Sequence, residues 1–249
     1  MKDFIAKPYK ALLEAHQLAS FEALWALQLK AVDEPNTGRG GWSSVYRLVL
    51  DGQAFYLKRQ TNHLTRSLYK PLGEPTFARE FRNILAYQQK NIPALEAAFF
   101  AERKVGTERR AILLTRALDD YQDLASYLPN WPSLAQSQKT ALLKACGTLA
   151  ATLHKAGQMH GCLYPKHIFL KPAGHAYQGA LIDLEKTRPL YFGERDRIKD
   201  LETLVRRAQI WSQEDCQVFL TSYLGESGIR VEQWYAKLSQ RLDRKGARV

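Results

Sequence analysis

The sequence has few cysteines and no long apolar run. Its 249 residues include three cysteines, too few and odd in number for a disulfide scaffold, so we expect a reducing compartment. No window approaches the roughly 18 consecutive apolar residues of a transmembrane helix. The N-terminus carries Asp3 early and has no apolar run before a cleavage site, so we expect no secretory signal peptide. There is no internal repeat and no low-complexity tract. These absences predict a cytoplasmic globular protein.

The composition is that of a globular protein with excess positive charge. Apolar residues make up 45% and charged residues 24%, which excludes a wholly disordered chain, a collagen and a coiled coil. Lysine and arginine number 36 against 25 acidic residues, a net charge of +11. Such a chain favours anionic partners, which could be a nucleotide, a phosphorylated lipid surface or a nucleic acid. Charge alone does not choose between them.

The apolar pattern changes along the chain. Strand-like runs dominate up to Thr115, and two of them flank Asp51-Gly52, a strong hairpin signal. Helical spacing dominates afterwards. We therefore predict an α+β fold of two lobes, a β-rich lobe over residues 1–115 and a helical lobe over 116–249. The predicted helices are Pro8–Leu29 (with a second start at Ser20), Phe77–Gln89, Leu124–Leu128, Ser137–Ala156, Asp200–Trp211, Asp215–Leu224 and Val231–Leu242. The predicted strands are Val45–Leu50, Ala54–Lys58, Ala97–Ala101, Ala111–Thr115, Ile168–Leu170 and Ala180–Ile182.

A glycine-rich segment lies among the N-terminal strands. Residues 38–45, Gly-Arg-Gly-Gly-Trp-Ser-Ser-Val, fit the G-x-G-x-x-G-x-V hairpin that covers ATP phosphates in protein kinases, with Ser43 in the third glycine's place. Residues without a side chain let backbone N–H groups approach phosphate oxygens closely. An ordinary hairpin turn is the commoner origin of such a pattern.

A lysine and a glutamate then follow in the order that protein kinases use. Lys58 ends the next strand, and Glu80 lies on the helix after it. In kinases a strand lysine binds the α- and β-phosphates and is held by a helix glutamate. An inward-facing lysine needs a compensating anion, so we expect an ion pair between Lys58 and Glu80. Considered singly, an outward lysine and a solvated glutamate are the simpler interpretations.

The stretch from Leu153 to Leu170 carries the most specific signal. A helix ends at Gly157, and residues 160–167, His-Gly-Cys-Leu-Tyr-Pro-Lys-His, match a kinase catalytic loop in front of a short apolar strand. Asp183 follows the next apolar strand, where kinases bind Mg²⁺. Asp200 resembles the helix aspartate that anchors the catalytic loop, and we expect His160 to be a buried, satisfied histidine. The order of these elements predicts a protein-kinase-like fold.

The whole chain resembles the bacterial lipopolysaccharide kinase family (Kdo and WaaP kinases), and within it the InaA-like proteins. The residues that carry the resemblance are Arg39–Ser43, Tyr56–Gln60, Phe77–Phe81, Leu163–His167 and Ile182–Leu184. The resemblance implies an ATP cleft between the lobes. It also implies ATP-dependent phosphorylation of a lipopolysaccharide core sugar at the cytoplasmic face of the inner membrane.

The resemblance further implies which residues bind the cofactors. His167 occupies the place of the kinase metal-binding Asn, as in other members, and Asp183-Leu184 is the family's variant of D-F-G. We therefore expect Asp183 and His167 to bind Mg²⁺ alongside ATP, or Mn²⁺, which imidazole suits better. The residues expected to bind ATP are Gly38, Gly40, Gly41, Ser43, Val45, Lys58, Glu80, Thr115 and Ala117.

Cys162 is the main departure from the kinase pattern. It stands where kinases have the aspartate that accepts the proton of the substrate hydroxyl. A thiol with a pKa near ~8.5 is mostly neutral at pH 7 and is a poor acceptor. Because positioning and charge neutralisation supply most of the catalysis, loss of the base slows transfer without preventing it. The catalytic candidates are Cys162, Asp183 and Glu185, which replaces the glycine of D-F-G.

The short interval from Asp183 to Asp200 bears on the acceptor. It spans 17 residues and contains no A-P-E-like end of an activation segment, which points away from protein substrates. A small or lipid-linked acceptor fits better. We expect the basic residues between Lys58 and Glu80 to face this anionic glycolipid or the inner membrane surface. They are Arg59, His63, Arg66 and Lys70.

The residues admit three other interpretations. A metal site is suggested by Cys146, His154, His160, Cys162 and His167, but their spacing follows no common zinc pattern. We expect no nucleic-acid partner, since no nucleic-acid motif accompanies the basic residues. The third is a pseudokinase that binds nucleotide as a regulatory module, because Cys162 replaces the catalytic aspartate.

Overall fold

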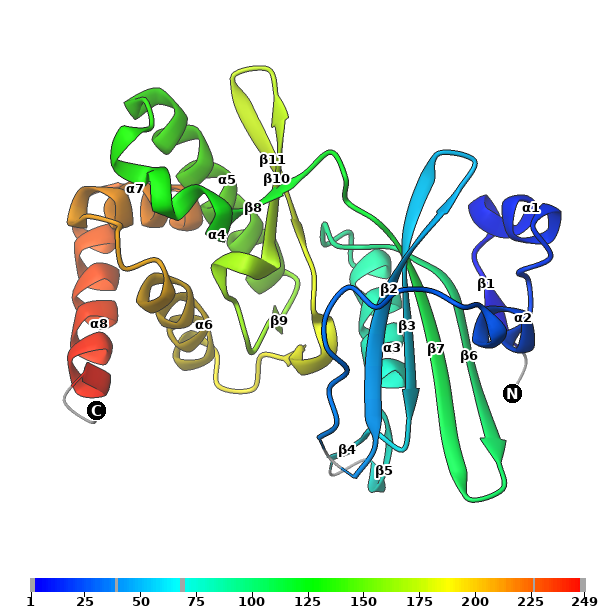
Figure 1. Cartoon of the computed structure of the whole chain (residues 1–249). Coiled ribbons are helices and arrows are strands. Elements are labelled where there is room, and N and C mark those ends of the chain that lie inside the picture. Colours follow the sequence, from blue (N-terminus) through cyan, green and yellow to red (C-terminus); the bar gives the residue numbers. More distant parts are fainter. Residues whose placement is uncertain (1–2, 39, 68–69, 226, 247–249) are drawn as a thin grey trace. The chain divides into compact units, whose positions relative to one another are not determined.

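The computed structural model describes residues 3–38, 40–67, 70–225 and 227–246. The chain forms two compact units (Figure 1). The first comprises residues 1–88 and 95–119, and the second comprises residues 89–94 and 120–249. Strands dominate the first unit and helices the second, which confirms the predicted α+β class.

An antiparallel sheet of five strands organises the first unit. Its order is β1-β6-β7-β3-β2, and a separate ribbon, β4–β5, follows β3. The β2–β3 hairpin turns at Asp51 and Gly52, both with positive φ, which confirms the predicted turn. The strands are β1 (Phe4–Ile5), β2 (Trp42–Leu50), β3 (Gln53–Thr61), β4 (Leu64–Ser67), β5 (Lys70–Pro75), β6 (Ala97–Val105) and β7 (Glu108–Arg116).

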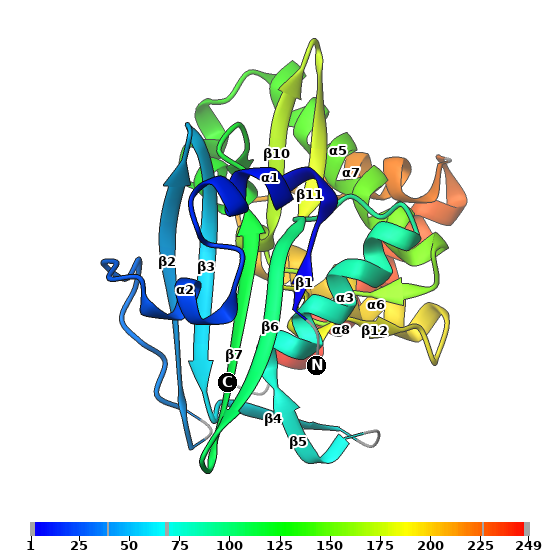
Figure 2. The same cartoon turned by 90° about the vertical axis from the view of Figure 1, so that its right-hand side faces the viewer.

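Helices cover both faces of this sheet (Figure 2). On one face, α1 (Lys7–Ala15) and α2 (Phe21–Ala26) bury leucine and phenylalanine side chains against those of the strands. On the other face lies α3 (Thr76–Gln89), whose Phe81 stacks on Phe100 of β6 with ring centroids 4.3 Å apart. Because side chains alternate along a strand, Phe55 and Leu57 of β3 point towards α1 and α2, whereas Lys58 points towards α3.

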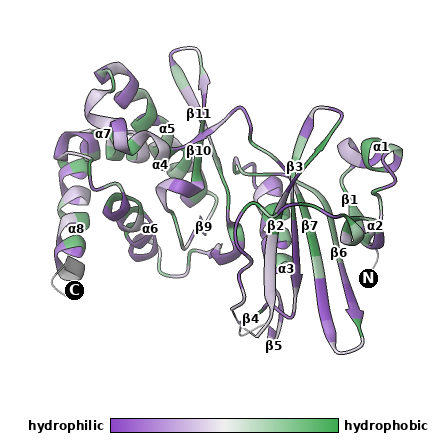
Figure 3. Cartoon of the chain, in the orientation of Figure 1, coloured by the Kyte–Doolittle hydropathy of each residue, from purple (hydrophilic) through white to green (hydrophobic). Residues whose placement is uncertain are grey.

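The β6–β7 hairpin is apolar at its base and polar at its tip (Figure 3). The stretches 97–101 and 111–115 are buried in the unit. Beyond them the tip carries a run of charged residues, Glu102–Lys104 and Glu108–Arg110. The core of the first unit therefore lies where the sheet is covered by helices.

Helix packing organises the second unit. Helix α5 (Gln136–Lys155) packs against α7 (Gln213–Leu224) and β11, and α8 (Ile229–Gly246) packs against α6 (Glu194–Arg207) and α7. The buried leucines of α5 confirm the helical spacing predicted there. The remaining helical segments are α4 (Leu124–Tyr127), η1 (Leu128–Ser133), η2 (Pro165–His167) and η3 (Leu184–Lys186). The strands are β8 (Gln122–Asp123), β9 (Gln158–Met159), β10 (Ile168–Ala173), β11 (Ala176–Leu181) and β12 (Arg188–Pro189).

The N-terminal segment forms two helices, which confirms the second start predicted at Ser20: α2 begins after Ser20, whose side chain accepts a hydrogen bond from the N–H of Ala23. The predicted helix bounds differ most from the structure at α6. The helix predicted from Asp200 begins six residues earlier, at Glu194. Acidic residues in its first turn interact favourably with the helix dipole, and Asp196 accepts the N–H groups of Tyr191 and Phe192. The acidic residues Glu194 and Asp196 in the first turn are thus a sequence signal for the earlier start of α6.

Truncation of the first core should cost much of its stability. Phe99 is fully buried between the sheet and the N-terminal helices. We expect Phe99→Ala to lower the free energy of unfolding by about 3–5 kcal/mol in urea titrations, through lost burial and a cavity. Leu72→Ala is the control, since Leu72 is 89% exposed. Equal effects of both substitutions would contradict this account of the core.

Candidate active site

Lys58 and Glu80 form an ion pair inside the first unit. Lys58 lies on β3 opposite Val45 of β2, and Glu80 lies on α3. The Lys58 Nζ atom is 2.6 Å from Oε1 of Glu80, and their side chains are 17% and 4% exposed. Either charge alone would be costly to bury, so each requires the other. The ion pair predicted from residue order is present.

The glycine-rich segment forms a turn in front of β2. Asn36 and Ser43 exchange backbone hydrogen bonds, and the Gly41 N–H donates to the carbonyl of Gly38. A Cβ at Gly41 would lie 2.2 Å from the carbonyl oxygen of Thr61, so this glycine permits close packing against the end of β3. The space beside Gly40 is open. Arg39 lies outside the described residues.

Thr115 and Ala117 lie at the end of β7 and just after it. Thr115 pairs with Tyr56 of β3 and is buried. The N–H of Ala117 donates to the carbonyl of Ala54 at 2.9 Å. That donor is therefore engaged within the first unit, and an adenine contact from Ala117 would use its carbonyl oxygen.

The prediction that four basic residues between Lys58 and Glu80 face an anionic surface is wrong for two of them. Arg59 and His63 are buried. Arg59 shares the face of β3 that points towards the N-terminal helices, where its guanidinium lies over the ring of Tyr46 and donates to the carbonyl of Leu27. The ring of His63 lies 2.9 Å from the Thr76 hydroxyl. Only Arg66 and Lys70 are exposed.

In the second unit, Asp200 holds the loop that resembles a kinase catalytic loop. Its buried carboxylate accepts the backbone N–H groups of His160 at 2.6 Å and Gly161 at 2.9 Å. Gly161 has a φ of +79°, and a Cβ there would lie 2.7 Å from the carbonyl oxygen of Lys186. Glycine is therefore required in this loop. The anchoring role predicted for Asp200 is confirmed, and His160 is buried and hydrogen-bonded as expected.

Cys162 follows this anchor and is buried. Its Sγ lies 3.4 Å from Nδ1 of His160 and 4.0 Å from Oδ2 of Asp183. Burial first, and then the negative charge of Asp183, raise the pKa of the Cys162 thiol to about 12. At this pKa the thiol is neutral at pH 7.

Asp183 and His167 lie side by side. Asp183 adopts the left-handed conformation, with φ of 58°, directly after β11 and Ile182. Its Oδ2 lies 3.2 Å from Nε2 of His167. Burial lowers the pKa of His167, against the opposing effect of Asp183. Glu185 follows in η3, close enough to contribute to the raised pKa of Cys162.

The structure also brings together three residues whose proximity the sequence spacing did not predict. One ligand atom each of His160, Cys162 and His167 lie within 4.8 Å of one another, and all three residues are buried. Cys146 and His154 lie apart from this group on α5, where the ring of His154 contacts Tyr223 and Asp200. Of the five residues that the sequence suggested as a metal site, three therefore lie close together.

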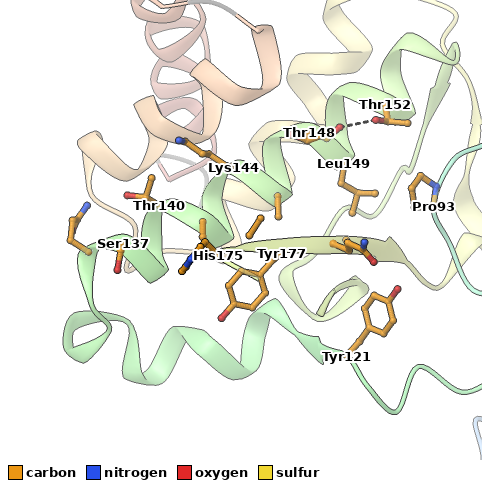
Figure 4. Close-up of a pocket in the computed structure, with 16 residues that line it drawn as sticks. Pro93, Tyr121, Ser137, Thr140, Lys144, Thr148, Leu149, Thr152, His175 and Tyr177 are labelled. Carbon is orange, nitrogen blue, oxygen red and sulfur yellow. Dashed lines mark hydrogen bonds between the residues drawn. The ribbon is translucent and has the colours of Figure 1, made fainter. Parts of the chain in front are cut away.

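The pocket between α5 and the β10–β11 hairpin is a separate feature (Figure 4). It has a volume of about 850 Å³, and its lining includes Tyr121, Lys144, Leu149 and Tyr177. None of the predicted site residues lines it. It therefore does not belong to the candidate active site.

Known proteins resemble this chain in both sequence and structure. A family model described as the lipopolysaccharide kinase (Kdo/WaaP) family matches residues 22–223. The chain belongs to this family. Protein InaA of Escherichia coli (strain K12) is 33% identical over 170 residues, which are 68% of this chain and 78% of that protein. The solved structure of WaaP in complex with acyl carrier protein matches with a TM-score of 0.73 and 24% identity, covering 100% of this chain and 99% of that chain.

The family model confirms the family predicted from the sequence, and the structural match confirms the predicted protein-kinase-like fold. A lipopolysaccharide kinase family implies the use of ATP and a divalent metal ion. Within the described residues, no helix combines the length and apolarity that crossing a bilayer requires.

The anchor of the loop can be tested by removing one charge. Asp200→Asn keeps the size of the side chain but loses charge-assisted hydrogen bonds to two N–H groups. We expect the free energy of unfolding to fall by about 1.5–3 kcal/mol in urea titrations at pH 7. Exposed Asp243 supplies the control Asp243→Asn. A change below ~0.5 kcal/mol for Asp200→Asn would rule out the anchoring role.

Proposed function

We propose that this protein transfers the γ-phosphoryl group of ATP to a sugar hydroxyl of the lipopolysaccharide core, at the cytoplasmic face of the inner membrane. The observation that carries the proposal is the ion pair between half-buried Lys58 and buried Glu80. A lysine held in this way presents a fixed positive charge to phosphate oxygens, as in kinases generally. Membership in the lipopolysaccharide kinase family supports this class of acceptor.

The nucleotide is proposed to bind mainly to the first unit. Lys58 contacts the α- and β-phosphates, with Glu80 as its positioning partner. The turn formed by Gly38, Gly40, Gly41 and Ser43 is proposed to face the phosphates. The N–H groups of Gly38, Gly41 and Ser43 donate within the turn, so the phosphate oxygens would approach at the open space beside Gly40. Val45, Thr115 and Ala117 complete the proposed nucleotide contacts.

The metal is proposed to bind through Asp183 and His167. Mg²⁺ prefers oxygen ligands, and this pair offers one carboxylate and one imidazole. The donors therefore suit Mn²⁺ better than Mg²⁺. When bound, such an ion neutralises charge on the transferring phosphoryl group. Asp183 remains 43% exposed at its side chain, so it is open to such a ligand.

A small or lipid-linked acceptor fits the segment between Asp183 and α6. This segment holds only η3, β12 and a turn before α6 begins. At the turn, Tyr191 and Phe192 are exposed by 59% and 64%. Their rings would suit the apolar part of a glycolipid at a membrane surface, which supports a peripheral contact with the inner membrane.

Cys162 favours a second candidate function, that of a pseudokinase which binds nucleotide as a regulatory module. The neutral thiol occupies the place of the general base, and its raised pKa leaves even less thiolate at pH 7 than a free cysteine has. Glu185 is the alternative base for an active enzyme. The two functions share nucleotide binding and differ in turnover.

Nucleotide affinity should depend on Lys58. We expect the double variant Lys58→Met, Glu80→Gln to weaken ATP–Mn²⁺ binding about 10–100-fold in calorimetry, since a charged hydrogen bond contributes ~1.5–3 kcal/mol. Changing both residues avoids leaving a buried carboxylate beside an apolar side chain. Lys171→Met is the control, since Lys171 pairs with Asp120 at the surface. Unchanged affinity in the double variant would exclude the phosphate-binding role.

Turnover should depend on residue 162. We expect Cys162→Asp to increase phosphate transfer to a lipopolysaccharide core acceptor by ~10²–10⁴-fold, the usual contribution of a general base, with little change in ATP affinity. Cys162→Asn is the matched control, with the same shape and no base. The assay is ATP turnover with and without acceptor.

The wild-type rate separates the two candidate functions. A negligible rate, with a gain for Cys162→Asp alone, supports a degenerate site. Ordinary turnover of ~1–100 s⁻¹ by the wild type, with no gain for Cys162→Asp, would reject the pseudokinase. Glu185 would then be the first residue to test as the base.

A further inference from the structure

The group formed by His160, Cys162 and His167 has the donor chemistry of a transition-metal site. Two imidazoles and a thiol are ligands typical of Zn²⁺, whereas Mg²⁺ prefers oxygen donors. The three residues come from the loop between β9 and β10 and are all buried in the second unit. Asp183 adds a carboxylate oxygen beside them, on their more exposed side.

Both rings are oriented by backbone carbonyl groups. Nδ1 of His167 lies 2.9 Å from the carbonyl oxygen of Cys162, and Nε2 of His160 lies 3.0 Å from that of Ile182. A carbonyl oxygen only accepts hydrogen bonds, so these two nitrogens carry the protons. Metal-binding histidines are commonly held in this way, with the second nitrogen directed at the metal.

The remaining nitrogens face the thiol of Cys162, whose S–H is a weak donor, and the carboxylate of Asp183, which only accepts. In the neutral rings, Nδ1 of His160 directs its lone pair at Cys162 Sγ, 3.4 Å away, and Nε2 of His167 directs its lone pair at Asp183 Oδ2, 3.2 Å away. A lone pair that faces a carboxylate oxygen requires a proton or a cation between them.

The spacing fits a tetrahedral ion after small adjustments. Zn–N and Zn–S bonds of about 2.0–2.3 Å place tetrahedral ligand atoms roughly 3.3–3.8 Å apart. The two contacts of 3.4 and 3.2 Å are close to this range, and Cys162 Sγ lies 4.0 Å from Asp183 Oδ2. The largest separation among the three buried ligand atoms is within 4.8 Å.

We propose that His160, Cys162 and His167, with Asp183 as fourth ligand, form a Zn²⁺ site in the second unit that binds the ion without nucleotide. Binding replaces the thiol proton of Cys162 with the metal, and the proton passes to solvent. The site goes beyond the proposed function and does not rest on it. Where both hold, Zn²⁺ occupies the donors of the nucleotide's metal and opposes its binding.

The test is calorimetric titration of the full chain, freed of metal by a chelator, with ZnCl₂ in the absence of nucleotide. We expect one equivalent of Zn²⁺ to bind and excess Mg²⁺ not to displace it. His167→Asn retains a side-chain N–H near the position of Nδ1 and removes the Nε2 ligand; Cys162→Ser removes the sulfur. Each should weaken binding by at least the roughly 10–100-fold that loss of a supporting partner costs.

Two controls and one spectrum decide the outcome. Cys216→Ser changes another buried cysteine, and His175→Ala changes an exposed histidine; neither should alter the affinity. The wild-type protein with Co²⁺ should show thiolate-to-metal charge-transfer absorption, a result that does not depend on any variant folding. No saturable Zn²⁺ binding, or no thiolate band with Co²⁺, overturns the proposal. Binding unaffected by both site variants, or lost in either control, also overturns it.

Discussion

The arrangement of the second unit depends on one buried carboxylate. Asp200 accepts hydrogen bonds from two successive backbone N–H groups, those of His160 and Gly161, and so fixes the path of the chain just before Cys162. A loop that crosses a protein interior must satisfy its backbone donors, and a carboxylate on a helix can satisfy two at once. Cys162 directly follows this attachment, and His167 lies further along the same loop.

The two units have retained the kinase pattern to different degrees. In the first unit, the lysine and glutamate are both present and paired. In the second unit the scaffold is kept, with Asp200 below the loop and Asp183 after its strand, while the chemistry of the loop has changed. A sulfur atom (Cys162) and one imidazole (His167) lie where a kinase has the oxygen donors of Asp and Asn, whereas His160 matches the kinase's own histidine. The change lies in the side chains that meet the ligand, and the backbone frame that carries them is retained.

Much of this organisation could be predicted because it depends on local pattern and residue order. The Asp51-Gly52 turn is set by its own two residues, and the partnership of Lys58 with Glu80 follows from a strand and the next helix. The burial of Arg59 was missed because β3 continues to Thr61, so that the strand alternation places Arg59 on the face of Phe55 and Leu57. The exposure of a basic residue cannot be judged from its charge alone.

The grouping of His160, Cys162 and His167 could not be read from spacing for a different physical reason. It depends on which ring nitrogen each histidine turns inwards, and that is decided by the carbonyl groups of Cys162 and Ile182. One of these carbonyl groups, that of Ile182, lies just after β11 and 15 residues beyond His167. A sequence motif specifies the residue types at a site. The proposed Zn²⁺ site depends in addition on how the imidazole rings of His160 and His167 are oriented.

The distribution of cysteines gives the molecule a built-in chemical reporter. All three, Cys146, Cys162 and Cys216, are buried, and all three belong to the second unit. A thiol reagent can reach them only when that unit opens, so the rate of their alkylation measures the opening of the second unit. The first unit has no thiol, so its opening does not contribute to the alkylation. Because the three thiols lie on α5, on the loop and on α7, their separate rates distinguish local opening of the loop from separation of the helices.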